Sequence, residues 1–140
     1  MFSKLNQKIV GSIYVMEKIR EDVVLIEMTS KETMTLDILK SLMKDIHILT
    51  DNKPYHSFTN ITTSSSEMTN DAKEYMKVLH KEETLNLSQV FIFESLSKAF
   101  LVGIYLSVMK QKLPTKCVTS IAKGYEWVDS LNSTKKSLSA

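Results

Sequence analysis

Cysteine, proline and glycine are scarce in this sequence: its 140 residues include one cysteine, two prolines and three glycines. A single cysteine excludes an intramolecular disulfide framework. Three glycines argue against a glycine-lined loop of the kind that cradles nucleotide phosphates. No apolar run reaches the ~20 residues of a membrane-spanning helix, and the polar start MFSKLNQK does not resemble a secretory signal. We therefore expect a cytoplasmic protein without a membrane span.

The composition, with 43% hydrophobic and 24% charged residues, is that of an ordinary globular domain. No repeat and no shift in composition divides the chain. We therefore expect one domain over residues 1–140, with its core at about 9–131 and a frayed C-terminal tail. Residues 1–94 hold 11 basic and 14 acidic side chains, whereas residues 95–140 hold 7 and 2. No aromatic residues interleave with the basic ones as they do on nucleic-acid-binding surfaces, so we expect no nucleic-acid partner.

Apolar and β-branched runs alternate with segments of helical periodicity along the chain. The predicted strands are residues 9–19, 23–28, 55–61, 87–94 and 115–119, and the predicted helices are residues 36–49, 70–81, 96–111 and 121–131. The polar tip between the first two strands predicts an N-terminal antiparallel hairpin. Helices that alternate with the later strands indicate parallel pairing. The pattern predicts an α/β fold with a mixed sheet of about five strands and four helices.

The strand predicted at 55–61 is unusually polar for a central strand, which normally reads as a near-continuous apolar run. Tyr55, Ser57 and Thr59 are expected to face one way. His56, Phe58 and Asn60 are expected to face the other way. Its polar side chains therefore need hydrogen-bond partners, and we interpret His56 as a hydrogen-bonded core or edge histidine.

The order of the elements resembles that of STAS domains, the fold of anti-sigma-factor antagonists. The C-terminal half is similar to a bacterial STAS-like family of largely uncharacterised stand-alone proteins. The resemblance covers roughly residues 10–131, and four segments carry it: Ala72-Lys73-Glu74-Tyr75, SKAFLVGIYLSVMKQK (97–112), Leu113-Pro114-Thr115-Lys116 and Tyr125-Glu126-Trp127-Val128. The resemblance implies a regulatory or protein-interaction module with no cofactor.

In antagonist STAS domains, the resemblance implies a phosphorylatable serine just after the third strand of the STAS pattern, where the second helix starts. Thr69 lies nearest to the matching position in this chain, and Ser66 comes next. A phosphate there meets a helix N-terminus and changes the charge of a docking surface. The chain departs from the family because Glu67-Met68-Thr69-Asn70 replaces the Asp-Ser-Ser-Gly-like turn. The other interpretation is that Thr69 or Asn70 simply caps the helix.

The helix predicted at 96–111 is apolar around most of its circumference, whereas a helix on a sheet needs one apolar stripe. We expect an outward docking surface, for an unknown protein partner or a second copy of the chain, made of Leu101, Ile104, Tyr105, Val108 and Lys112. The alternative, in which neighbouring helices bury these side chains, is equally open. A second functional interpretation is a small-molecule or lipid-binding domain with a cleft beside residues 96–111, because STAS folds resemble CRAL-TRIO lipid-transfer domains.

Recognisable catalytic and metal-binding patterns are absent from the sequence. His47, His56 and His80 are dispersed, and Cys117 has no neighbouring metal-ligand partner, so we predict no metal site. We interpret Cys117 as a small buried hydrophobic residue. Nucleophile-elbow, Walker-type and zinc-protease motifs do not occur. We predict no catalytic residues; an enzyme with a cleft at Tyr55, His56 and Asn60 is the third interpretation.

Overall fold

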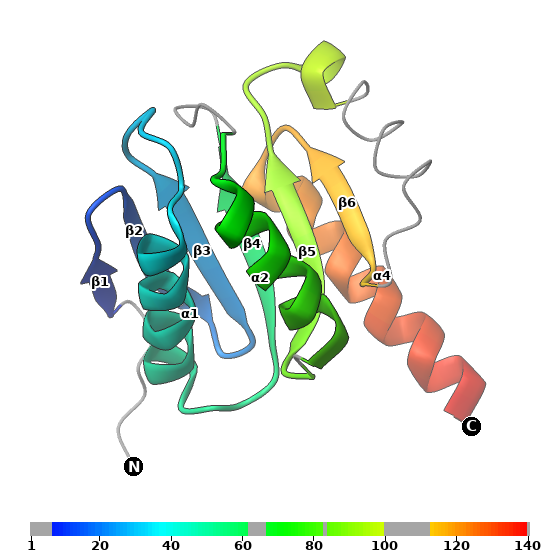
Figure 1. The fold of residues 1–140 in the computed structure, drawn as a ribbon. Coiled ribbons are helices and arrows are strands. Elements are labelled where there is room, and N and C mark those ends of the chain that lie inside the picture. Colours follow the sequence, from blue (N-terminus) through cyan, green and yellow to red (C-terminus); the bar gives the residue numbers. More distant parts are fainter. Residues whose placement is uncertain (1–6, 62–66, 83, 100–112, 140) are drawn as a thin grey trace.

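The computed structural model describes residues 7–61, 67–82, 84–99 and 113–139 (Figure 1). Their six strands form one sheet in the order of the sequence. The strands are β1 (Lys8–Val10), β2 (Tyr14–Arg20), β3 (Val23–Met28), β4 (Tyr55–Asn60), β5 (Asn86–Ile92) and β6 (Thr115–Val118). The first two pairs, β1–β2 and β2–β3, are antiparallel, and the later pairs are parallel. The predicted α/β fold with an N-terminal hairpin is confirmed.

The sheet has six strands instead of about five because the segment predicted as one strand at 9–19 is interrupted. The Gly11 amide donates to the Tyr14 carbonyl over 2.8 Å, which turns the chain back on itself. A Cβ at Gly11 would lie 2.2 Å from Tyr14 Cζ, so the ring of Tyr14 occupies the space that a side chain would need. The absence of a side chain at Gly11 therefore permits the close turn between β1 and β2.

Three long helices among the described residues cover the two faces of the sheet: α1 (Leu36–Thr50), α2 (Asn70–Glu82) and α4 (Ile121–Ser139). Residues 96–99 form a further helical turn. Figure 1 shows α1 and α2 on the near face and α4 on the far face. The near core cluster includes Met16, Val24, Ile26, Leu42, Ile46 and Ala72. The far core cluster includes Val23, Leu25, Phe58, Val90, Val118 and Val128. The protein is therefore a three-layer domain with one core on each side of the sheet.

Helix α1 begins and ends where its sequence indicates. Thr35 is the N-cap, and its side chain accepts a hydrogen bond from the Ile38 amide. Leu39, Ile46 and Leu49 are buried, as their spacing predicts. The helix ends at Thr50, and the C-cap residue Asp51 adopts a left-handed conformation with φ of 54°.

Helix α4 begins at Ile121 as predicted, but its length and the burial of its first residue differ from the prediction. The backbone remains helical to Ser139, so the segment expected as a frayed tail continues the helix. Ile121, placed by the periodicity on the inner face, is 37% exposed. Gly124 and Val128 are buried as predicted, and Val128 is fully buried. The inner face therefore starts one turn later than its first apolar residue suggests.

Strand β4 lies between β3 and β5 in the parallel part of the sheet, with Ser57 opposite Val24 on one side and Gln89 on the other. Ser57 lines a cavity on the α1 and α2 side, whereas Phe58 belongs to the far core cluster. The predicted alternation of this strand is thus confirmed. It places a line of polar side chains beneath α1 and α2.

Candidate functional site

The predicted docking surface lies outside the described residues. Leu101, Ile104, Tyr105, Val108 and Lys112 all belong to this part of the chain, as does the second candidate phosphorylation site, Ser66. The surface and the cleft beside residues 96–111 therefore stay predictions. Thr69, the first candidate phosphorylation site, is described.

Thr69 occupies the N-cap position of α2, because its carbonyl accepts the first helical hydrogen bond, from the Lys73 amide over 3.0 Å. Its hydroxyl donates to Asp71 Oδ1, and the same oxygen accepts the Ala72 amide over 2.9 Å. The hydrogen bond from Thr69 lowers the pKa of the Asp71 carboxyl. Thr69 therefore occupies the N-cap position expected for it, but its hydroxyl donates to Asp71 and the Asp71 carboxylate is the group that accepts a helix amide.

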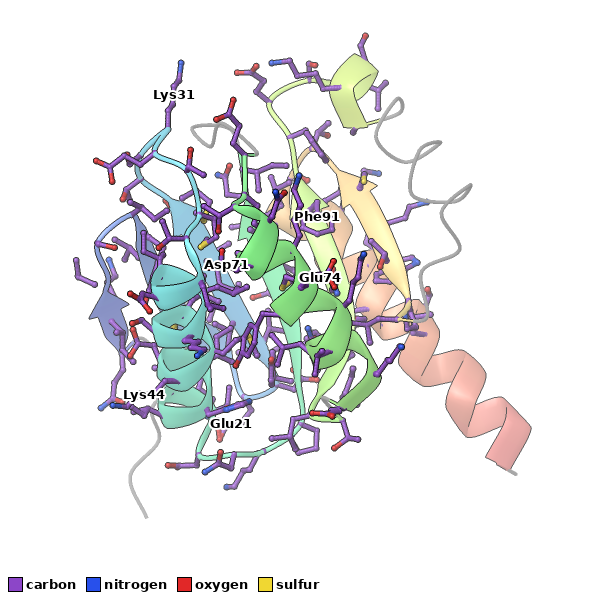
Figure 2. The ribbon with its side chains drawn as sticks, viewed as in Figure 1. Glu21, Lys31, Lys44, Asp71, Glu74 and Phe91 are labelled. Atoms are coloured by element: carbon purple, nitrogen blue, oxygen red, sulfur yellow. The ribbon has the colours of Figure 1, made fainter. Side chains whose placement is uncertain are left out.

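Two loops meet at this helix start. Thr69 donates its amide to the carbonyl of Met34, and Met34 donates its amide to the carbonyl of Glu67, each over 3.0 Å. Met34 and Met68 form an isolated parallel bridge. We call the surface formed by Glu32, Thr33, Glu67, Thr69 and Asp71 the α2-start surface. It is acidic, since Glu32, Glu67 and Asp71 are all exposed; Figure 2 shows Asp71 where α2 begins.

A hydrogen-bonded network on the opposite face of the sheet contains His56. Its Nδ1 and Ser88 Oγ are 2.6 Å apart, and its Nε2 lies 3.7 Å from Asp22 Oδ2. His56 is 3% exposed, so the interpretation of a hydrogen-bonded core histidine is confirmed. Arg20 donates to Asp22 over 2.8 Å and to Asp129 of α4 over 3.1 Å. This network joins the hairpin end of the sheet to α4 and gives His56 a structural role.

Cys117 lies on β6 and is half-buried. Burial raises the pKa of its thiol, despite the opposing charge of Lys116. The sequence-based interpretation as a small hydrophobic residue fits this position. Among the described residues, no group of three or more His, Cys, Asp and Glu side chains is placed to hold one metal ion.

Sequence reasoning missed a cavity of about 350 Å³ between α1, α2 and strands β3–β5. Figure 2 shows Phe91, one of its lining residues, on β5 beside α2. Five of the eight methionines in the chain line it: Met28, Met34, Met43, Met68 and Met76. The polar side chains of β4 and β5 form its floor: Ser57, Thr59, Asn86 and Gln89. The concentration of methionine and the polar alternation of 55–61 are the sequence signals that could have indicated it.

Asn86 lies on the floor of this cavity, opposite Tyr55 in the ladder of β4 and β5. Its Nδ2 donates to Ser57 Oγ over 3.3 Å, and Ser57 Oγ donates in turn to the Ser88 carbonyl over 3.4 Å. Its Oδ1 is buried and has no hydrogen-bond partner among the described residues. A buried acceptor without a donor costs free energy, so this atom is an unusual feature of the site.

No described helix has both the length and the apolar character needed to cross a membrane.

Comparison with known proteins identifies a family and a fold. A family model described as "Domain of unknown function (DUF7793)" matches residues 17–132. No curated protein matches the chain. The chain is similar to the crystal structure of an uncharacterized protein of the DUF3478 family, with a SpoIIAA-like fold, from Shewanella loihica PV-4. The TM-score is 0.57 with 12% identity, over 91% of this chain and 98% of that chain. At this identity the likeness concerns the fold, and it confirms the STAS-like architecture.

Proposed function

We propose that this chain, which belongs to the DUF7793 family, is a non-enzymatic module that regulates a protein by docking to it. The SpoIIAA-like fold supports a STAS-like module. The observation that carries the proposal is the position of Thr69, whose hydroxyl lies at the N-cap of α2, nearest to the site of the regulatory serine in STAS antagonists. A cytoplasmic location, and a partner that is another protein or a second copy of the chain, are part of the proposal.

The α2-start surface gives Thr69 the means to act as a switch. The unmodified hydroxyl donates to the Asp71 carboxylate. A phosphothreonine has no hydroxyl proton to donate and adds about −1.5 to −2 charge. It would therefore replace an attractive contact with repulsion from Asp71, within a surface that already carries Glu32 and Glu67.

The consequence of this repulsion reaches beyond one side chain, because Thr69 also holds the two loops together. Its amide bonds to the Met34 carbonyl, and its own carbonyl receives the first hydrogen bond of α2. Displacement of Thr69 would loosen the bridge between Met34 and Met68 and reshape the α2-start surface. Phosphorylation thus acts by changing the shape and the charge of a docking surface together.

A series of substitutions at Thr69 tests this switch. The quantity measured is the affinity of each variant for a partner protein that the natural chain captures from the native cell. Thr69→Glu is expected to weaken partner binding at least tenfold, because it introduces a charge beside Asp71. Thr69→Ser keeps the hydroxyl and serves as the matched control, with unchanged affinity. Thr69→Ala removes the hydroxyl without adding charge and separates the two effects. Equal binding by all four proteins, or a lack of phosphate anywhere in residues 62–70 under varied growth conditions, would remove the switch.

The predicted docking surface at Leu101, Ile104, Tyr105, Val108 and Lys112 has its own test. Replacement of Leu101 and Tyr105 by Glu is expected to abolish partner capture or self-association while the fold is retained, because charges prevent burial of an apolar contact. Circular dichroism and the unfolding midpoint monitor the fold. Unfolding of the double variant would show that these side chains belong to the core and would contradict the assigned surface.

A further inference from the structure

We propose that the cavity between α1, α2 and strands β3–β5 is a binding site for a small, neutral, apolar alcohol, whose hydroxyl donates a hydrogen bond to Asn86 Oδ1. This site goes beyond the docking function, because it lies beneath the helices and not on the α2-start surface. Its size carries the first part of the inference. A volume of about 350 Å³ lies within the range of roughly 300–1,000 Å³ typical of small-molecule pockets.

Ordinary packing does not account for an opening of this size. Protein cores are close-packed, with few voids larger than a water molecule. Here the near core cluster is well buried at Ile26, Leu39 and Ile46, yet the same residues line an open volume. The cavity is therefore a recess against a well-formed core that opens to solvent at Glu32 and Glu67, which is a usual setting of a preformed ligand site.

The walls are suited to an apolar body of variable shape. Methionine side chains are unbranched and polarizable, and they adjust to ligands of different outline. Met28 and Met34 lie toward the α2-start surface, and Met43 and Met76 come from the two covering helices. The ligand body is therefore aliphatic or otherwise apolar.

The floor specifies the polar group of the ligand. The chain of hydrogen bonds from Asn86 Nδ2 to Ser57 Oγ, and from Ser57 Oγ to the Ser88 carbonyl, fixes the orientation of the Asn86 amide. Since the Ser57 proton is used in this chain, Asn86 Oδ1 needs a donor from elsewhere. A ligand hydroxyl supplies that donor and removes the cost of the unsatisfied acceptor.

Charge excludes the other common amphiphiles. Among the described lining residues, Glu32 and Glu67 are the charged ones, and both are exposed at the rim. A ligand carboxylate would be repelled by them, and it carries no proton to donate to Asn86 Oδ1. A protonated amine at Asn86 would bear the desolvation cost of a buried charge. A neutral alcohol avoids both penalties.

Titration of the full chain with 1-octanol, octanoate and octylammonium at pH 7 tests the site. Octanol is expected to shift the side-chain amide resonances of Asn86 in NMR spectra. It should also raise the unfolding temperature with increasing concentration, because it binds the native state. Octanoate and octylammonium should each bind with at most one tenth of the affinity of octanol. Absence of octanol binding, equal binding of octanoate, or resonance shifts confined to residues outside the cavity would overturn the proposal.

Substitutions of residues that line the cavity provide a second test of octanol binding. Asn86→Leu should weaken octanol binding at least tenfold. The unfolding midpoint of the free protein should change little, because removal of the unsatisfied acceptor offsets the loss of the hydrogen bond from Asn86 Nδ2 to Ser57. Asn60→Leu, the same substitution near the end of β4, is the matched control and should keep full affinity. If Asn86→Leu fails to fold, Thr59→Phe, which fills the cavity from β4, should abolish binding instead. Full octanol affinity in Thr59→Phe would contradict the site, whatever the outcome of the docking experiments.

Discussion

At the scale of the residue, Gly124 controls how closely α4 approaches the sheet. A Cβ added there would lie 2.7 Å from Phe58 Cε2 and 3.2 Å from Val90 Cγ1. Both neighbours are fully buried, so neither can move into solvent. A glycine in mid-helix normally costs about 1 kcal/mol relative to alanine, and here the close approach of the helix outweighs that cost.

Gly124→Ala is therefore expected to lower the free energy of unfolding by about 1–3 kcal/mol, the usual effect of overpacking a core. Ala122→Gly, at an exposed position of the same helix, measures the propensity difference alone and should cost about 1 kcal/mol. Urea unfolding of both variants checks the prediction. A more stable Gly124→Ala variant would show that α4 does not lie this close to Phe58.

Asp22 links stability to pH. Burial acts to raise its pKa, but the hydrogen bond and the charge of Arg20 outweigh burial and hold the pKa below the ordinary value of 3.8. Because the pKa of Asp22 is lower in the folded than in the unfolded chain, ionisation of Asp22 stabilises the folded protein. This stabilisation is fully present above the unfolded pKa and is lost as the pH falls through the folded pKa.

Asp22→Asn should therefore lose less stability than the natural chain between pH 5 and pH 3, because it lacks this proton uptake. Urea midpoints measured at several pH values, at low salt to limit screening, provide the comparison. Parallel pH profiles for the two proteins would mean that the ion pair of Arg20 and Asp22 contributes no pH dependence.

Several single residues were predictable from the sequence because local chemistry determines them. Thr35 caps α1 with its side chain, as its residue type and position predict. Thr69 occupies the N-cap position of α2, but its hydroxyl donates to Asp71 instead of accepting a helix amide. His56 needed a partner because it lies in a central strand, and Ser88 supplies one. Asn86 was not predictable, since its unsatisfied oxygen depends on contacts with Ser57 across the sheet.

At the scale of the element, the N-cap of α1 is a direct test of local helix chemistry. Thr35 accepts a hydrogen bond from the Ile38 amide over 3.3 Å, and its own side chain is exposed. Thr35→Ala is expected to lower the free energy of unfolding by about 1 kcal/mol, because one N-terminal amide loses its acceptor. Thr119→Ala, at an exposed position just after β6, is the control and should stay within about 0.5 kcal/mol. Equal losses in both variants would contradict the capping role.

Element types followed from periodicity, whereas two boundaries did not. The apolar content of residues 9–19 predicts one strand, but the turn at Gly11 depends on the ring of Tyr14 and divides it. The helix after Ser120 was expected to lose its packing face after Leu131, yet α4 continues to Ser139. Apolar spacing indicates the part of a helix that is packed, and it does not indicate where a solvated helix ends.

At the scale of the whole molecule, the order of the elements predicted a mixed sheet with parallel pairs and an N-terminal hairpin, whereas the order of the strands in the sheet comes from the structure. Helices that alternate with parallel strands leave few arrangements open, and the sheet has its strands in sequence order. The cavity could not be predicted in this way, because its volume depends on the distance that α1 and α2 keep from β3, β4 and β5. Methionine enrichment was its one compositional sign, and methionines also fill ordinary cores.

Lysine positions offer a way to locate docking on the intact molecule. Lys31 and Lys73 are exposed and flank the α2-start surface along the chain, whereas Lys44 is exposed near the far end of α1. Figure 2 shows Lys31 and Lys44 at opposite ends of the molecule in that view. A lysine-reactive cross-linker applied in the native cell therefore separates docking at the α2-start surface from docking elsewhere.

The most direct measurement is mass spectrometry of the cross-links between this chain and its partner, for the natural chain and for Thr69→Glu. The docking account predicts cross-links from Lys31 and Lys73 to one protein, their loss in Thr69→Glu, and few from Lys44. Cross-links that concentrate at Lys44, or that are unchanged in Thr69→Glu, would contradict it.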